Sequence, residues 1–209
     1  MQTVTETISN NLPFYIKETF VEEPKQFKWT KKEYHYLAEL GLFEGKRTEF
    51  LEGEIIEMPT MNSPHATGLT LTQTILQTNF TQGFVVRGQM PLDFGEDYEP
   101  VPDIAIISGN ARDFLSAHPQ TAQLVVEISD TTLSYDRNRK ASLYAKHNIL
   151  DYWILNLKNR TLEVYRSPIE DENAYYGFAF SEKITFKEND EVFSLVKPET
   201  KIKVTDLLP

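Results

Sequence analysis

The chain has 209 residues, of which 40% are hydrophobic and 25% are charged, as is usual for a globular protein with a buried core. It contains no cysteine, which excludes disulfides and thiolate metal sites and leaves oxygen and imidazole groups as possible metal ligands. The formal net charge of −10 argues against a protein that coats nucleic acid non-specifically, because such binding needs clustered lysine and arginine.

The N-terminal segment differs from the rest of the chain. Residues 1–28 contain Pro13 and Pro24 and show no hydrophobic period, so we predict an N-terminal arm there and a single domain over residues 29–209. The start lacks a basic segment followed by an apolar run, and no apolar stretch approaches the roughly 20 residues of a membrane span. We therefore expect a cytoplasmic location without a membrane contact.

The first predicted elements are a helix and a hairpin. Thr30 and Glu33 have the spacing of a capping box, and Gly41 is a plausible stop, which predicts a short amphipathic helix between them. In RTEFLEGEIIEMP, Glu52 and Gly53 separate two strand-like runs, which predicts a hairpin. A second helix begins near Asn62 or Ser63, either of which can cap it, with a proline in its first turn.

The remaining elements alternate between strand and helix patterns. GFVVRGQMPLDF predicts one or two strands, and VPDIAIIS and TAQLVVEIS each predict a buried strand. DRNRKASLYAKHN predicts a helix capped by Asp136 or Ser134, followed by the strands DYWILNL and TLEVYR and a β-rich tail. This order predicts an α/β fold with a mixed sheet flanked by helices, a right-handed crossover and extra strands at both ends.

Two acids lie at the ends of neighbouring predicted strands. Asp103 opens the strand DIAII, and Glu127 lies near the end of LVVEIS. If the two strands pair antiparallel, these residues are neighbours, and the alternation of side chains allows both to point to one face. Lys140 lies one helical turn after Asp136 and so stays near the same end. Two carboxylates and one ammonium group are thus predicted to converge.

This arrangement favours a hard divalent cation. Acids among aliphatic residues are costly to bury as ions, and side by side they repel one another unless a cation intervenes. Oxygen ligands suit Mg²⁺ or Mn²⁺, with the carbonyl of Ile128 as a further possible ligand. Such a metal would polarise a phosphoryl oxygen and activate a water, and Lys140 would stabilise the developing charge or orient that water.

A purely structural interpretation stays open at this point. An aspartate at the start of a strand often makes a turn hydrogen bond. Glu127 could be exposed, or it could pair with Arg137 or Lys140. The charged run over residues 136–146 is typical of a solvated helix face.

Several blocks of the chain resemble the Uma-two family of restriction endonucleases, a branch of the PD-(D/E)XK nuclease superfamily. The resemblance runs from Arg47 to about Arg166, over RTEFLEGEIIEMP, SPHATG, QMPLDFGEDYEPVPDIAII, LVVEISDTTLSYDRNRKASLYAKH and DYWILNLKNRTLEVYR. It implies a restriction-endonuclease-like fold, a Mg²⁺-dependent endonuclease that acts on DNA without an organic cofactor, and metal-binding acids at Asp103 and Glu127.

One position departs from the pattern of the superfamily. The acid and a lysine usually share one strand with one residue between them, and Ser129 occupies the lysine's place here. The resemblance moves this role to the next helix, where Lys140 fits and Lys146 is the fallback. It also points to Glu49 as a catalytic residue, acting as a third ligand or an orienting group, although Glu49 could instead be an exposed strand acid.

Two further residues have alternative interpretations. His65 could donate to a phosphate or help to order a water, or it could be an ordinary histidine of a helix's first turn. Gln89 lies near the site if its strand adjoins that of Asp103, but a hydrogen bond at a strand edge explains it equally well. Tyr152 and Trp153 are predicted to be core residues.

Two other roles compete with the nuclease. Ser129 and the acidic net charge would also suit a nuclease-fold module that binds nucleic acid or a protein partner without turnover. The TLEVYR strand and the aromatic tail could pair across a homodimer; the aromatic residues of that tail are Tyr175, Tyr176, Phe178 and Phe180.

Overall fold

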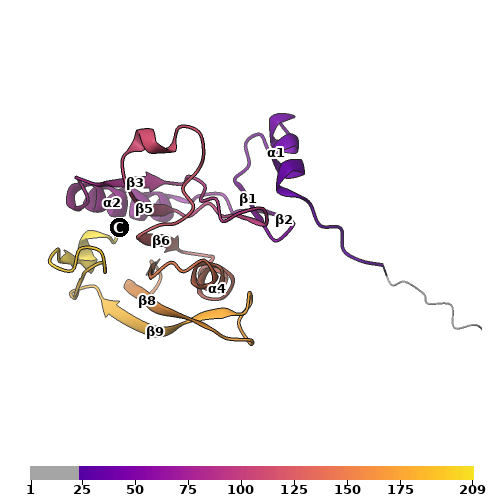
Figure 1. Ribbon diagram of the computed structural model, residues 1–209. Coiled ribbons are helices and arrows are strands. Elements are labelled where there is room, and N and C mark those ends of the chain that lie inside the picture. Colours follow the sequence, from indigo (N-terminus) through magenta and orange to yellow (C-terminus); the bar gives the residue numbers. More distant parts are fainter. Residues whose placement is uncertain (1–23) are drawn as a thin grey trace, which may run out of the picture.

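The computed structural model describes residues 24–209, so most of the predicted arm, residues 1–23, lies outside the described residues. A six-stranded mixed sheet forms the centre of the molecule, with the order β3-β5-β6-β7-β8-β9 (Figure 1). Its strands are β3 (Phe84–Gly88), β5 (Ile104–Ser108), β6 (Leu124–Ser129), β7 (Asp151–Asn156), β8 (Thr161–Glu170) and β9 (Phe178–Lys187). β6 and β7 are parallel, and the other neighbours are antiparallel.

Two smaller sheets extend the central one. The first has the order β2-β1-β4, with strands β1 (Thr48–Leu51), β2 (Glu54–Glu57) and β4 (Tyr98–Glu99). The second pairs β10 (Glu191–Val192) with β11 (Ile202–Lys203) near the C-terminus. The predicted extra strands at both ends are therefore confirmed.

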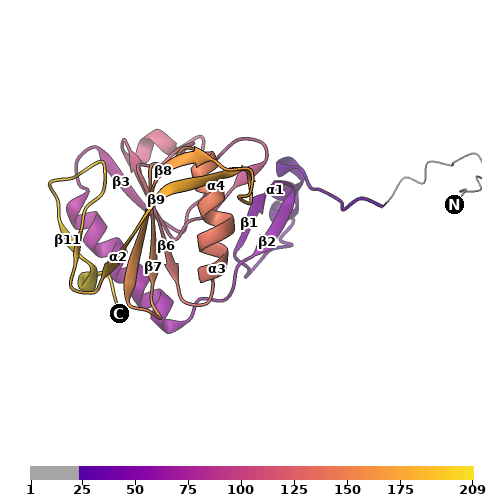
Figure 2. The same cartoon turned by 90° about the horizontal axis from the view of Figure 1, so that it is seen from below.

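Helices cover both faces of the central sheet (Figure 2). α2 (Ser63–Asn79) packs on one face, and a helix made of α3 (Leu133–Tyr135), the π-type turn η2 (Asp136–Lys140) and α4 (Ala141–Lys146) packs on the other. α1 (Lys31–Glu39) lies beside the small sheet, and the short turns η1 (Ala111–Phe114) and η3 (Val204–Asp206) lie in connections. Within residues 24–209, we find no helix with the length and apolar character that crossing a membrane requires.

The alternation of side chains along β5 and β6 explains this layering. Ile104 and Ile106 belong to the core under α2, whereas Ala105 and Ile107 belong to the core under α4. Because both faces are covered, β5 and β6 are mostly apolar, as the sequence predicts, and Glu127 and Ser129 at the end of β6 are the polar exceptions within the buried part. The α/β fold class is confirmed, and Tyr152 and Trp153 are core residues on opposite faces.

Local signals set the ends of the first two helices as predicted. The Thr30 hydroxyl accepts a hydrogen bond from Glu33 N, and the Glu33 carboxylate accepts one from Thr30 N, which completes the capping box. At α2, the Asn62 side chain accepts from His65 N at 3.0 Å.

Two predicted details are wrong, and the open choice between one and two strands in GFVVRGQMPLDF is decided in favour of one. The helix after β6 begins at Leu133 rather than near Asp136, because the chain already turns at Thr132, whose carbonyl accepts from Asp136 N. Gln89 lies just beyond β3 with a positive φ of 52°, so GFVVRGQMPLDF contains one strand. The TLEVYR strand lies inside β8, which is paired on both sides and cannot pair across a dimer; β9 forms that edge of the sheet.

The β1–β2 turn gives a stability prediction. Gly53 has φ +76°, and a Cβ there would lie 2.8 Å from Lys28 Cβ, whereas exposed Gly83 has φ +77° with nothing within 4 Å. Both Gly→Ala changes incur the roughly 1–2 kcal/mol cost of left-handed backbone, and only Gly53→Ala adds a clash of about 1–3 kcal/mol. Urea unfolding should therefore show Gly53→Ala to be the less stable variant; equal stability would contradict the close approach of Lys28 to Gly53.

Candidate active site

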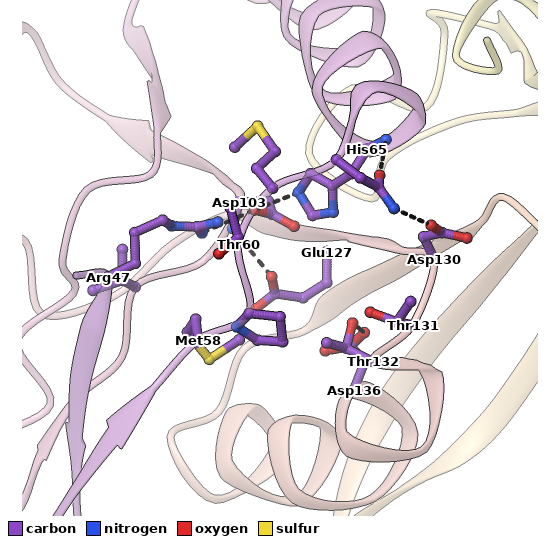
Figure 3. Close-up of a pocket in the computed structure, with 14 residues that line it drawn as sticks. Arg47, Met58, Thr60, His65, Asp103, Glu127, Asp130, Thr131, Thr132 and Asp136 are labelled. Atoms are coloured by element: carbon purple, nitrogen blue, oxygen red, sulfur yellow. Dashed lines mark hydrogen bonds and ion pairs between the residues drawn. The ribbon is translucent and has the colours of Figure 1, made fainter. Parts of the chain in front are cut away.

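The structure brings Asp103 and Glu127 together at one end of the β5–β6 pair. The register pairs Ile104 with Val126, so the two acids are opposite each other one step further along. Asp103 N donates to Glu127 Oε2 at 3.1 Å, and Ile128 N donates to Asp103 Oδ2 at 2.9 Å. Both acids are only 4% exposed, and both line one small pocket (Figure 3).

Three donors surround the other oxygen of Asp103. His65 Nε2 lies 3.2 Å from Oδ1, Gln89 Nε2 lies 3.3 Å away, and the Arg47 guanidinium lies 3.4 Å away. Burial alone would raise the pKa of Asp103, but His65, the Ile128 amide and Gln89 outweigh it and lower that pKa. The pKa of His65 is correspondingly raised by Asp103, against the opposing effect of burial. Asp103 is thus stabilised as a carboxylate.

Glu127 has the opposite tendency. Burial raises its pKa to about 8, and the nearby charges of Asp103 and Asp136 add to this increase against the attraction of Lys140. Tyr144 donates to Glu127 Oε1 at 2.7 Å, and Lys140 Nζ lies 3.2 Å from the same oxygen. In this arrangement the two neighbouring acids are not both readily ionised near neutral pH.

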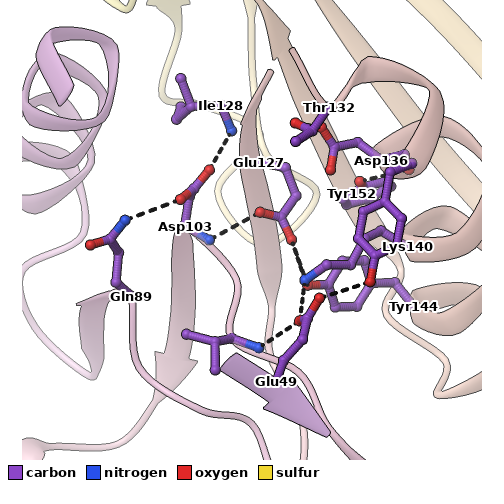
Figure 4. A network of polar contacts seen from close by, with 12 residues as sticks. Glu49, Gln89, Asp103, Glu127, Ile128, Thr132, Asp136, Lys140, Tyr144 and Tyr152 are labelled. Carbon is purple, nitrogen blue, oxygen red and sulfur yellow. Dashed lines mark hydrogen bonds and ion pairs between the residues drawn. The ribbon is translucent and has the colours of Figure 1, made fainter. Parts of the chain in front are cut away.

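Lys140 is fully buried behind Glu127 (Figure 4). Its Nζ donates to Glu49 Oε2 at 2.7 Å, and Glu49 is itself held by the Tyr135 hydroxyl and by Val101 N. Burial would lower the pKa of Lys140, but Glu127 and Glu49 reverse this and raise it. Glu49 is fully buried as well. Its contacts are those expected of a residue that orients Lys140, and they do not suit a third metal ligand as well.

The π-type turn η2 carries a further acid in the same pocket. Asp136 is buried, lines the pocket with Asp103 and Glu127, and accepts from Thr132 Oγ1 at 2.7 Å. Burial raises the pKa of Asp136 to about 6. Turns of this kind are frequent at functional sites, and this one holds both Asp136 and Lys140 on its inner side.

The donor set fits a small hard cation. The pocket has a volume of about 30 Å³, enough for a water molecule or a small ion. Within residues 24–209, no group of three or more Asp, Glu or His side chains is arranged to hold a metal. A site with two carboxylates and retained waters is, however, the usual form for Mg²⁺. A cation would also oppose the burial, and the repulsion from Asp103, that raise the pKa of Glu127.

Residues 32–192 match the model of the family described as "Uma2: Putative restriction endonuclease". This match covers well over half of the chain. The chain belongs to the Uma2 family. No curated protein sequence matches it.

Two solved structures are similar to this Uma2 chain. One is described as a putative nuclease belonging to DUF820 from Anabaena variabilis; it is 17% identical, with a TM-score of 0.57, over 77% of this chain and 88% of that one. The other is the type IIG restriction endonuclease BpuSI, 18% identical with a TM-score of 0.32, over 49% of this chain and 11% of that one. The first match shows that the Uma2 chain has a nuclease-like fold.

Three of the other sequence-based candidates contact Asp103 in this Uma2 structure, and one lies elsewhere. His65 and Gln89 both contact Asp103, as described above. Ile128 contacts Asp103 through its amide, and a ligand role for its carbonyl stays a prediction. Lys146, the fallback lysine, contacts the Tyr98 hydroxyl at 2.9 Å, away from both acids.

Sequence reasoning missed three residues of this environment. Arg47 comes from the edge of the small sheet, and no local pattern connects it with Asp103. Asp136 has the residue type of a helix cap, and Tyr144 fits the apolar side of a helix, so neither residue indicates a site on its own. The spacing of four residues on either side of Lys140 places Asp136 and Tyr144 on its helix face and could have identified both.

The charged run over residues 136–146 is not a solvated face. Lys140 and Asp136 are buried, and Arg137 pairs with Glu163, not with Glu127. Arg139 pairs with Glu54 of the small sheet at 2.7 Å.

Proposed function

We propose that this Uma2 protein is a metal-dependent endonuclease of the PD-(D/E)XK type that hydrolyses DNA phosphodiester bonds. The observation that carries the proposal is the convergence of two buried carboxylates, Asp103 and Glu127, on a pocket backed by a buried ammonium group, Lys140. A cytoplasmic location and a homodimer remain part of the proposal.

Asp103 and Glu127 are the residues that would hold Mg²⁺ or Mn²⁺, with the Ile128 carbonyl as a further candidate. When bound, the cation supplies Lewis acidity toward a phosphoryl oxygen and toward a water. Lys140 favours the ionised form of Glu127 through the 3.2 Å contact, and Glu49 fixes Lys140 in turn. Lys140 is therefore a positioning residue here, and its direct contact with a phosphate stays a prediction.

Two donors on the pocket wall suit the substrate phosphate. His65 lies in the first turn of α2, and its side chain is partly exposed to the pocket. Arg47 has a side chain that is one-third exposed and reaches the same pocket from β1's edge. Both hold Asp103 now and could bind a phosphate oxygen beside it.

Plasmid cleavage tests the proposal. We expect the wild type to cleave DNA with Mg²⁺ and to lose activity with EDTA, and we expect Asp103→Asn to show no detectable cleavage because a metal-binding charge is gone. Glu188→Gln is the matched control, since Glu188 pairs with Arg160 on the surface away from the pocket. Equal cleavage by Asp103→Asn and wild type would refute the proposal.

The second candidate is a binding module without turnover. Complete burial of Lys140 favours it, because the ammonium does not reach the pocket in this arrangement. Calorimetric titration separates the two: the nuclease requires binding of Mg²⁺ or Mn²⁺ that Asp103→Asn weakens, and the module does not.

A further inference from the structure

A second, larger groove opens directly beside the acidic pocket. The two share Met58, Pro59, Thr131 and Thr132 in their walls. The groove has a volume of about 630 Å³, within the roughly 300–1,000 Å³ typical of small-molecule sites. We call it the side groove; beyond the shared residues it is lined by Ile56, Glu57, Ser134, Tyr135, Asn138, Arg139 and Tyr175.

An exposed aromatic ring forms one wall of the side groove. Tyr175 lies in the turn between β8 and β9, which reaches the end of the molecule where β1 and β2 lie (Figure 1). It is 58% exposed, so burial in the core does not explain it. Its ring is nonetheless held in place, with the Arg139 guanidinium 4.9 Å from its centroid and the Tyr176 ring edge-on at 4.8 Å.

The support beneath this ring is rigid. Arg139 donates to the Tyr176 hydroxyl and to Glu54 of β2, both at 2.7 Å, which ties the β8–β9 turn to the helix and the small sheet. A cation, a flat aromatic ring and the exposed amide of Asn138 therefore line one space, and Asn138 Nδ2 donates to the Ser134 carbonyl at 2.7 Å, which holds that amide in place. This combination matches the flat face and polar edge of a nucleobase.

We infer that the side groove binds one unpaired base of the DNA strand, stacked on Tyr175, next to the phosphate held in the acidic pocket. The placement of that phosphate rests on the proposed function. Neighbouring bases cover both faces of a base inside a duplex, so the preferred substrate is single-stranded DNA or a strand from which one base has been turned out.

The charges around the side groove agree with stacking as the source of affinity. Glu57 on its wall pairs with Lys46 at 2.8 Å, and Arg139 is already paired with Glu54. The groove is thus not a basic phosphate channel. Contact between aromatic rings and bases tolerates such a surface, because it depends on π-faces more than on net charge.

Binding of a short oligothymidine with a single 2-aminopurine tests the inference. All proteins carry Asp103→Asn to prevent cleavage, and His65 and Arg47 remain in the acidic pocket as donors for the neighbouring phosphate. We expect Tyr175→Ala to weaken binding roughly tenfold and to lose quenching of the 2-aminopurine, while Tyr175→Phe retains both. Tyr36→Ala is the matched control, since Tyr36 on α1 is similarly exposed at 60% and lies outside the groove.

Two outcomes overturn the inference: equal binding by Tyr175→Ala and Tyr36→Ala, or a parent protein that binds duplex DNA as tightly as the single strand. Its failure is distinguishable from failure of the proposed function. Mg²⁺-dependent cleavage by wild type with no effect of Tyr175→Ala removes the base site alone, whereas Tyr175-dependent binding without cleavage by wild type removes the nuclease alone.

Discussion

Replacing Lys140 with methionine is expected to lower the free energy of unfolding by roughly 3–5 kcal/mol, because it removes one partner of a buried ion cluster. Lys140 Nζ lies 2.7 Å from Glu49 and 3.2 Å from Glu127, and all three residues are buried. Methionine fills a similar volume but leaves both acids without their cation. Urea unfolding followed by tryptophan fluorescence measures the change.

Lys146→Met is the matched control for this loss. Its ammonium contacts the Tyr98 hydroxyl and ring near the surface, so we expect a change of about 1 kcal/mol or less. Adding Glu49→Gln to Lys140→Met should restore part of the stability, because one uncompensated charge disappears with it. A Lys140→Met protein as stable as wild type would mean that the ion cluster is not formed as described.

The second large effect is expected for Glu127→Gln, which should lower DNA cleavage by a factor on the order of 10³, since a lost metal carboxylate removes several kcal/mol of transition-state stabilisation.

The same change should stabilise the metal-free protein at alkaline pH. The folded-state pKa of Glu127 is about 8, above its ordinary value of 4.5. The wild type therefore loses stability as the pH rises from 4.5 through 8, and the variant lacks this loss.

Glu163→Gln provides a contrasting control for Glu127→Gln. Glu163 is equally buried, but bonds from Arg137, Lys183 and Tyr165 outweigh burial and lower its pKa to about 2. Its replacement should reduce stability at neutral pH and leave cleavage intact. If Glu127→Gln behaved in the same way as Glu163→Gln, Glu127 would be a structural acid.

The meeting of Asp103 and Glu127 could be predicted from the sequence because it follows from two local rules. Alternating side chains place each acid on a known face, and antiparallel pairing of β5 with β6 sets the start of one strand beside the end of the other. The same rules predict which residues of these strands face which helix. Neighbouring residues alone likewise predict the hairpin at Glu52 and Gly53. They also predict the helix caps at Thr30 and Asn62.

The surroundings of the two acids depend on contacts between distant segments. Glu49 and Lys140 are 91 positions apart, and Arg47 and Asp103 are 56 apart, so no periodicity connects them. The charged pattern around Lys140 is typical of a surface helix. Lys140 is buried here because the small sheet covers this part of the helix. That sheet supplies Glu49 as the partner of Lys140 and Glu54 as the partner of Arg139.

The start of the helix after β6 shows a different limit. Asp136 has the residue type of a helix cap, but its side chain lies inside the pocket and bonds to Thr132 instead. An acid at a helix start can thus be a cap or a site residue, and the distinction depends on which way the preceding loop turns.

Crystals soaked with Mn²⁺ and measured for anomalous scattering show whether Asp103 and Glu127 share a metal ion. We expect one Mn²⁺ in contact with a carboxylate oxygen of Asp103 and one of Glu127, in the pocket that His65 and Asp136 also line. We also expect the ion to be absent from Glu127→Gln crystals treated in the same way. No ion at this pocket in the wild type, or an ion bound without either acid, would refute a metal site at these two residues.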